Sequence, residues 1–348
     1  MTAEHLLADL VVVDFSELLP GPFFTQNLVE LGARVIKVER PGGDNARALG
    51  PGLFAAVNRG KEHVTADLRD DADRRRVAEL VATADVVVEG FRPRVLERLG
   101  FGPERLTQRH PQLVYVSLSG FGQHGPLSDE PGHDNTYAAY AGVLSLAGRP
   151  GGPPEWGPGV PVADLCAAMY ATSATLAALR HRDRTGRGLC VDVSIRDCLA
   201  HWLNPRLGGF AHNGLSDVSE QRASALSRPG YGTFACADGT AVAIAAIEDH
   251  FWAGLVRGLG LVEWTDPRWA RHAARRAATT EINAAIADAV LTRDGRAVVA
   301  ELSACGVPVA PVLGPGDALD AAEAEGTGRV FRHPEAGRLY RFPVLFSS

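Results

Sequence analysis

The chain has 348 residues, of which 46% are hydrophobic and 22% are charged, a composition that excludes a disordered or collagen-like protein. The length fits two domains or one large one. Asp and Glu (41) outnumber Lys and Arg (35), so the net charge is −6. This balance argues against a nucleic-acid-binding protein, because no excess of positive charge is present to neutralise phosphates.

The first 120 residues predict strands that alternate with helices. Residues 10–15 (LVVVDF) form an apolar run typical of a buried strand, and helical spacing over 23–31 is followed by a second apolar run at 34–38. Such a unit is expected to be a right-handed parallel crossover. The pattern continues with helices at 70–84, 94–99 and 103–110 and strands at 85–89 and 113–119. The alternation of strands and helices predicts an open α/β sheet with ligands bound beyond the carboxyl ends of its strands.

The second half of the chain is less regular. Residues 148–161 are dense in Gly and Pro and predict a long loop, which is often functional in a compact domain. A helix at 164–181 and a strand at 190–195 follow, and a break is expected around 214–229. A hairpin at 232–247 that turns at Asp238-Gly239 then leads into helices at 251–259 and 280–291. These elements predict a smaller α+β unit.

The five cysteines are odd in number and form no C-x-x-C pair, so we expect neither a metal site nor a disulfide framework. Reduced thiols favour a cytoplasmic protein. The first residues have no basic segment followed by an apolar one, and no run of 18 apolar residues occurs, so we expect no signal peptide and no membrane span.

The chain contains none of the glycine-rich or nucleophile motifs that would assign a chemistry directly. The loop after 10–15 carries Pro20-Gly21-Pro22 instead of G-x-G-x-x-G, and no Walker A, G-x-S-x-G or H-E-x-x-H motif is present. An α/β rhythm without the glycines gives no reason to expect a dinucleotide cofactor.

Three arginines follow predicted strands, where a bound phosphate would lie. Arg40 comes after the strand at 34–38, and Arg92 and Arg98 come after the strand at 85–89. Each could place a cation beside a phosphate, although a single exposed arginine is ordinarily a solvated surface residue.

Four further residues combine acid–base chemistry with a position near the expected ligand edge. His133 and Asp134 open a helix after the strand at 113–119, and Asp134 could simply cap that helix. Asp164 could be a helix cap or an acid–base residue. Glu248 follows the predicted hairpin and, taken alone, fits a solvated turn.

A long ordered series of motifs resembles the family III CoA-transferases and acyl-CoA racemases. The series is GPFFTQNLVELGARVIKVERPGGD (21–44), VNRGKEHVTADLR (57–69), ADVVVEGFRPRVLERLG (84–100), LVYVSLSGFGQHGP (113–126), PGHDNTY (131–137), VADL (162–165) and AIED (246–249). The resemblance implies a large Rossmann-like α/β domain with an open, mostly parallel sheet, a smaller α+β domain, and an interlocked homodimer. We expect the large domain at 1–215, the small domain at 222–315, and a C-terminal segment at 316–348 that returns to the large domain.

A few positions distinguish the reactions that occur within this family. Racemases carry G-H-D, which matches Gly132-His133-Asp134, and their acid–base pair matches His133 and Asp164, with Glu248 orienting the histidine. Transferases use an aspartate nucleophile at the position of Asp164, carry a Tyr where this chain has His133, and have a run of glycines where residues 228–232 (RPGYG) contain two. The resemblance therefore implies an α-methylacyl-CoA racemase. A CoA-transferase with Asp164 as nucleophile is the rival enzyme, and a CoA-ester binding protein with little turnover is the third alternative.

Two departures from the racemase pattern surround Asp164. Val160 stands where racemases carry an asparagine, and residues 165–168 (LCAA) replace a glycine-rich stretch.

The implied mechanism is a two-base proton transfer that inverts the carbon next to the thioester through an enolate. His133 and Asp164 would act on opposite faces, and the Asp164 N–H is a candidate donor to the enolate oxygen.

The resemblance also implies how the substrate is held. No metal or redox cofactor is expected, because CoA is part of the acyl-CoA substrate. Beyond that substrate, a second copy of the chain is the partner expected, with neither nucleic acid nor membrane. The implied substrate-binding residues are Arg40, Arg92 and Arg98 at the phosphates, Ala66, Asp67, Leu68, Arg69, Gly90 and Phe91 at the nucleotide, and Gly132, Asp134, Asn135, Thr136 and Tyr137 beside the catalytic pair.

Overall fold

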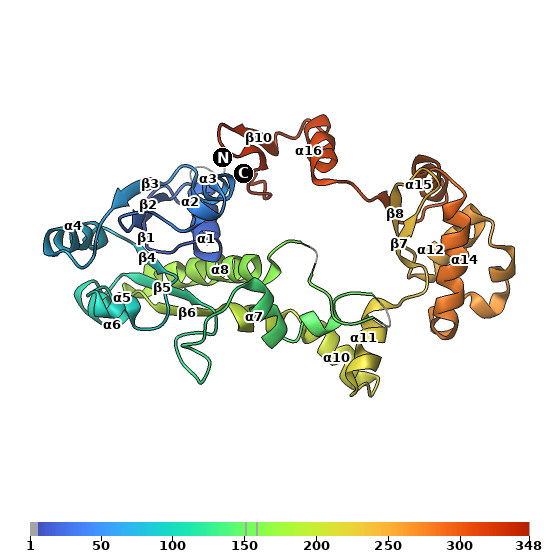
Figure 1. Cartoon of the computed structure of the whole chain (residues 1–348), viewed down its shortest axis with the longest axis horizontal. Helices are drawn as coiled ribbons and strands as arrows, with labels where there is room; N and C mark the ends of the chain where they lie inside the picture. The colour runs from blue at the N-terminus through green and yellow to red at the C-terminus, as the bar shows by residue number, and fades with distance from the viewer. Residues whose placement is uncertain (1–5, 150–151, 158, 348) are drawn as a thin grey trace. The chain divides into compact units, whose positions relative to one another are not determined.

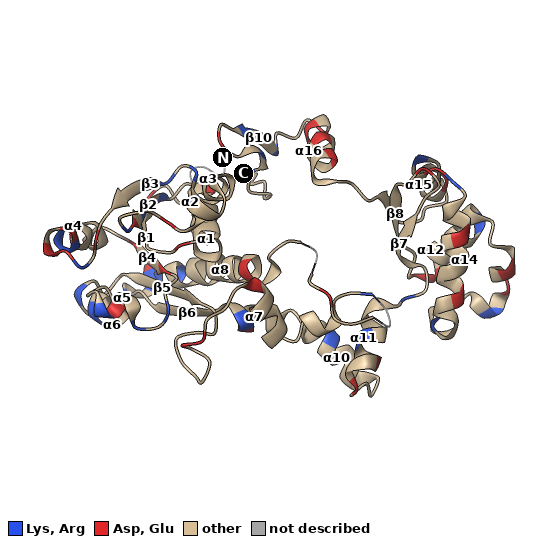
Figure 2. Ribbon diagram, in the orientation of Figure 1, with Lys and Arg blue, Asp and Glu red and all other residues tan. Residues whose placement is uncertain are grey.

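The computed structural model describes residues 6–149, 152–157 and 159–347, which form two compact units (Figure 1). Unit 1 comprises residues 1–145, 156–207 and 322–348, and unit 2 comprises residues 146–155 and 208–321. The chain thus passes between the units at 145/146, 155/156, 207/208 and 321/322. The sequence predicted two passages, at 215–222 and at 315/316. Charges of both signs are interspersed over the helices of both units (Figure 2).

Residues 146–155 group with unit 2, although the sequence assigned them to the large domain. The physical reason is a contact with Arg222, whose side chain is buried. Its guanidinium donates hydrogen bonds to the carbonyl oxygens of Arg149 (3.2 Å) and Pro153 (2.6 Å) and so ties this segment to the helix that carries Arg222. The predicted loop at 148–161 includes residues 150, 151 and 158, which lie outside the described residues.

Unit 1 is built on a six-stranded parallel sheet in the order β3-β2-β1-β4-β5-β6, which confirms the predicted α/β class. The sequence missed β3 because it is an edge strand of largely exposed residues (EHVT) with no apolar run. The strands are β1 (Val11–Asp14), β2 (Arg34–Glu39), β3 (Glu62–Thr65), β4 (Val86–Glu89), β5 (Val114–Ser119) and β6 (Cys190–Ser194).

Alternate side chains of the central strands enter two different cores. Val12 packs in a cluster with Phe24 and Cys166, whereas its neighbour Val13 packs in a second cluster with Val77. Both faces of the central strands are therefore buried, which explains why these strands read as continuous apolar runs.

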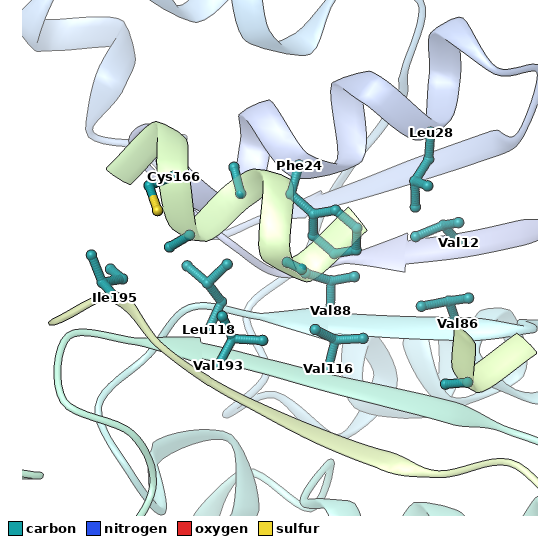
Figure 3. Close-up of a cluster of buried hydrophobic side chains, with 14 of the residues drawn as sticks. Val12, Phe24, Leu28, Val86, Val88, Val116, Leu118, Cys166, Val193 and Ile195 are labelled. Atoms are coloured by element: carbon teal, nitrogen blue, oxygen red, sulfur yellow. The ribbon is translucent and has the colours of Figure 1, made fainter. Parts of the chain in front are cut away.

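The helices that follow β1 and β5 cover the same face of the sheet. Phe24 and Leu28 of α1 (Pro20–Glu30) and Cys166 of α8 (Val162–Thr185) belong to one cluster on one side of the strands (Figure 3). Because β2 and β6 lie on opposite sides of the central strands, the crossovers through α1 and α8 have opposite hands. The other face of β6 is left without that helix, and Cys190 and Asp192 there are exposed.

Helices α1 and α8 begin earlier than the sequence predicts. Helix α1 starts at Pro20 because proline tolerates the first helical position, where its missing N–H would have no partner. Helix α8 starts at Val162, so Asp164 lies inside its first turn and is not its first residue. The remaining helices of unit 1 are α2 (Ala46–Leu49), α3 (Pro51–Asn58), α4 (Asp71–Ala82), α5 (Val95–Arg98), α6 (Pro103–Arg109), α7 (Asp134–Tyr140) and α9 (Ile195–His201).

Helix α8 is, among the described residues, the one helix long and apolar enough to cross a membrane by length and composition. In unit 1 it packs against α1, β5 and β6, as the core helix of a sheet does. The apolar composition of α8 is therefore weak evidence for a membrane span.

Unit 2 contains the predicted hairpin. Strands β7 (Tyr231–Ala235) and β8 (Ala241–Ala245) pair antiparallel, with Gly239 in the left-handed region of their turn, and β9 (Val309–Pro311) pairs with β8. The expected break around 214–229 is wrong, since Asp217 caps a helix there. The helices are α10 (Asn204–His212), α11 (Val218–Leu226), α12 (Asp249–Leu259), α13 (His272–Arg275), α14 (Thr279–Leu291), α15 (Gly295–Ala304) and α16 (Pro315–Ala324), of which α10 and α16 extend across the unit boundaries.

The C-terminal residues of unit 1 form the hairpin β10 (Val330–His333) and β11 (Gly337–Tyr340). The N–H of Phe342 donates to the Glu30 carboxylate at the end of α1 (2.6 Å), and the Arg59 guanidinium lies over the Phe331 ring. These contacts join the last segment of the chain to the first helices.

Candidate functional site

A cavity of about 470 Å³ opens at the carboxyl ends of β1, β4 and β5, the edge where ligands bind in open α/β sheets. We call it the Asp164 cavity. It brings together His133 and Asp164, which are 31 positions apart in the sequence. Its lining residues are Glu17, Leu18, Pro20, Gly21, Asn45, Gly90, Phe91, Arg92, Pro93, Leu118, Ser119, Gly120, Ser128, Glu130, Pro131, Gly132, His133, Tyr137, Asp164 and Ile195.

Asp134 caps a different helix from the one expected. Its Oδ1 accepts hydrogen bonds from the N–H groups of Ala163 (2.6 Å) and Asp164 (3.2 Å), in the first turn of α8. The N-cap residue of its own helix, α7, is His133. The proposal that the Asp164 N–H stabilises an enolate is therefore wrong for this conformation, because that group already has an acceptor.

The backbone of His133 is fixed by Thr136. The Thr136 hydroxyl accepts a hydrogen bond from the His133 N–H (2.9 Å) and donates one to the His133 carbonyl (2.8 Å). Thr136 and Asn135 are exposed and do not line the cavity, so the predicted contact of these two residues with substrate finds no support in the cavity lining.

Tyr137 packs against two glycines of the cavity wall. Its hydroxyl donates to the Gly132 carbonyl (2.7 Å), and a Cβ at Gly132 or Gly120 would lie 2.3 or 2.5 Å from the ring. Burial raises the pKa of Tyr137 to about 12, with a further contribution from the negative charge of Asp164. Tyr137 thus stays neutral at physiological pH.

Asp164 is a partly buried titratable group in the wall of the Asp164 cavity. Burial raises the pKa of its carboxyl to about 7, and the nearby charge of Asp134 adds to the rise. The carboxylate is therefore more basic than an exposed aspartate near neutral pH. A perturbed carboxyl group inside a cavity is typical of a catalytic residue, although structural groups can be perturbed in the same way.

A second cavity of about 270 Å³ lies beside the first and is lined by five of the six predicted nucleotide-binding residues. We call it the nucleotide cavity. Gly90, the sixth of these residues, lines the Asp164 cavity. Glu17 and Phe91 line both cavities, so one elongated ligand could occupy the two together. The lining residues are Phe15, Glu17, Val38, Arg40, Ala66, Asp67, Leu68, Arg69, Phe91 and Leu99.

Two of the three arginines predicted at the phosphates lie outside the nucleotide cavity. Arg92 lines the Asp164 cavity and not the nucleotide cavity, and the exposed Arg98 lines neither. Glu248 is the N-cap residue of α12 in unit 2, with an exposed side chain, so its pairing with His133 stays a prediction.

The departures from the racemase pattern have different surroundings. Cys166, Ala167 and Ala168 are buried in the core between α8 and the sheet, where small residues let the helix approach closely. Val160 is 52% exposed and does not line the Asp164 cavity. The changes at 166–168 are therefore explained by packing, and nothing in the structure explains Val160.

Sequence reasoning missed Glu17, Leu18 and Asn45 as cavity residues. Glu17 and Leu18 follow β1 directly, so their position after the first strand could have identified them. In the described part of the chain, no group of three or more His, Cys, Asp or Glu residues is arranged to hold a metal ion.

Comparisons with known proteins agree on one family. The profile of CoA-transferase family III matches residues 7–348. An acetyl-CoA:oxalate CoA-transferase of Acetobacter aceti is 36% identical over 323 residues, covering 90% of this chain and 81% of that protein. A succinyl-CoA:mesaconate CoA-transferase of Haloarcula hispanica is 35% identical, covering 90% and 82%. The crystal structure of a CAIB/BAIF family protein from Brucella suis superposes with a TM-score of 0.85 at 32% identity, covering 97% and 92% of the two chains.

Proposed function

The chain belongs to CoA-transferase family III, and from that premise we propose that it transfers coenzyme A between carboxylic acids with Asp164 as the nucleophile. The observation that carries the proposal is the Asp164 carboxyl in a cavity that shares two wall residues with the nucleotide cavity. The naming of its relatives as CoA-transferases supports it further.

The chemistry follows from a carboxylate beside a thioester. The Asp164 carboxylate attacks the thioester carbonyl carbon, and the C–S bond breaks with its electron pair remaining on the CoA sulfur. The thiolate then attacks the Asp164 carbonyl carbon of the resulting anhydride, which releases the donor acid and leaves CoA bound to Asp164 as a thioester. An acceptor carboxylate repeats these two steps in reverse and leaves as the new acyl-CoA.

Trapping of the enzyme-bound intermediate tests this mechanism. The protein is incubated with acetyl-CoA, quenched with hydroxylamine, and digested for mass spectrometry of the peptide that contains Asp164. We expect a hydroxamate at Asp164, because both the anhydride and the thioester are attacked by hydroxylamine. An unmodified Asp164 in a protein that nevertheless transfers CoA would rule out this nucleophile. A panel of oxalate, succinate, mesaconate and glutarate identifies the acceptor, since the relatives are named for such dicarboxylic acids.

A second candidate is the α-carbon epimerisation that the sequence resemblance favours. The observation in its favour is the position of His133 on the same cavity as Asp164, which provides a second proton carrier. Incubation of a chiral 2-methylacyl-CoA in deuterated water separates the two reactions. Deuterium uptake and loss of optical purity without an acceptor acid would support the racemase, and CoA transfer only when a free acid is added would support the transferase.

The pKa of Asp164 predicts the pH dependence of transfer. The nucleophile must be ionised, so kcat/KM is expected to rise with pH and to level off above the Asp164 pKa of about 7. Asp134→Asn removes the neighbouring charge while retaining an oxygen that can accept from Ala163 and Asp164. Its pH profile should move to lower pH but stay above that of a free aspartate, since burial is the larger cause. An unmoved profile would show that another group limits the rate.

A further inference from the structure

The turn between β1 and α1 carries a backbone conformation that leucine rarely adopts. Among the described residues, Leu18 (φ 68°) and Arg94 (φ 67°) are the two non-glycine residues in the left-handed region. A leucine there is strained by contact between its Cβ and the backbone, and such residues persist where the surrounding structure holds them. Leu18 lines the Asp164 cavity and Arg94 does not.

A buried ion pair holds Leu18 in this conformation. The Leu18 N–H donates to Oδ1 of Asp44 (3.0 Å), while Oδ2 of Asp44 lies 2.9 Å from Nζ of Lys37, and both charged side chains are fully buried. Lys37 also donates to the Ser16 carbonyl (2.6 Å), two residues before Leu18. Lys37 therefore binds the Ser16 carbonyl directly and holds the Leu18 N–H through Asp44.

The same turn is fixed on its other side by the start of α1. A Cβ at Gly21 would lie 2.2 Å from Cβ of Ser16, so the turn closes as tightly as a glycine permits. Nζ of Lys61 donates to the Pro22 carbonyl (3.0 Å) from a fully buried position. The turn holds three apolar residues, Phe15, Leu18 and Leu19, and of these Leu18 is the one that lines the Asp164 cavity.

We propose that Leu18 is a specificity-determining residue of the Asp164 cavity, held by the Lys37–Asp44 pair so that its side chain forms an apolar wall for the acyl group of the thioester. The inference rests on the proposed function, because it takes the Asp164 cavity as the acyl site. Glu17, the preceding residue, lines both cavities, which places Leu18 at the passage from the nucleotide side to Asp164.

Two substitutions that tolerate a left-handed backbone test the side chain without breaking the turn. Leu18→Gly and Leu18→Asn both accept this φ value and retain the N–H that Asp44 binds. We expect kcat/KM for the preferred acyl-CoA to fall about tenfold or more, which is the range for lost apolar contacts in a substrate pocket. The ratio of kcat/KM for long-chain to short-chain acyl-CoA should rise, because the shortened side chain leaves room, and the melting temperature should stay near that of the wild type.

Arg94→Gly is the matched control, since it relieves the same kind of backbone strain at a residue outside both cavities. Its melting temperature is expected to be maintained or raised, with no change in the preference for acyl chain length. An unchanged chain-length preference in both Leu18 variants would overturn the proposal.

Equilibrium binding separates this proposal from the proposed function. Affinities for free CoA, acetyl-CoA and a long-chain acyl-CoA are measured by calorimetry for the wild type and for Leu18→Gly. If the wild type shows no CoA transfer, the transferase proposal fails, yet a change in ester affinity with unchanged affinity for free CoA would still support Leu18 as the acyl wall. Equal effects on free CoA and on the esters would overturn that role.

Discussion

Asp164→Asn is expected to abolish CoA transfer, with a loss on the order of 10⁴-fold or more, as for removal of the nucleophile from other covalent catalysts. An amide cannot form the anhydride, so the hydroxylamine-sensitive intermediate should disappear as well. The measurement is the rate of acyl-CoA formation with saturating donor and acceptor acid, together with mass spectrometry of the trapped enzyme.

The fold of this variant is expected to survive. Burial raises the pKa of Asp164 from 3.8 in the unfolded chain to about 7 in the folded protein. The free energy of unfolding therefore falls as the pH rises from 3.8 through 7, because the folded state disfavours the ionised carboxylate. At pH 8 the asparagine variant should therefore melt no lower than the wild type. A large drop in melting temperature would mean that the loss of activity reflects unfolding.

His133→Ala separates the two enzyme candidates in the same assay. A transferase that uses Asp164 alone retains the trapped intermediate when the imidazole is removed. A two-base racemase loses α-proton exchange for at least one enantiomer. Exchange that continues at the full rate for both enantiomers would exclude His133 as an acid–base catalyst.

Asp14→Ala is expected to destabilise unit 1 by about 3–5 kcal/mol, the range for breaking a buried ion pair from one side. Asp14 and Lys61 are fully buried and 3.1 Å apart, and the Asp14 carboxylate also accepts from the hydroxyls of Ser16 (2.5 Å) and Thr25 (2.6 Å). Burial alone would raise the pKa of Asp14, but Lys61, Lys37 and these hydroxyls outweigh it and lower the pKa to about 2. Denaturant unfolding at pH 7 measures the effect.

Two controls distinguish a buried charge effect from general damage. The double variant Asp14→Asn with Lys61→Met should recover much of the loss, because no unpaired ammonium remains inside the protein. Glu62→Gln removes the partner of Arg34 in an exposed pair and should change stability far less, because water screens that pair. Since the Asp14 pKa is depressed from 3.8 to about 2, its contribution is present above pH 3.8 and is lost as pH falls through 2. A loss for Asp14→Ala as small as that for Glu62→Gln would contradict the assigned role of the pair.

The apolar runs of β1, β2, β4 and β5 predicted the α/β class because these strands are covered on both faces. The same reasoning missed the edge strand β3 and the short helices α2 and α3, which have no long apolar period. The hand of the crossover through α8 could not be predicted from the sequence either, because it depends on the face of the sheet against which α8 packs.

Residue types and motif order by themselves determined the family and the parallel sheet, and they marked His133 and Asp164 as candidate catalytic residues. Only the tertiary structure decided that Asp134 caps α8, that Arg92 faces the Asp164 cavity, and that Leu18 is held in a strained turn by Lys37 and Asp44. The reason is physical: strands and helices follow from local periodicity, whereas the partner of a buried charge and the lining of a cavity depend on residues that are distant in the chain.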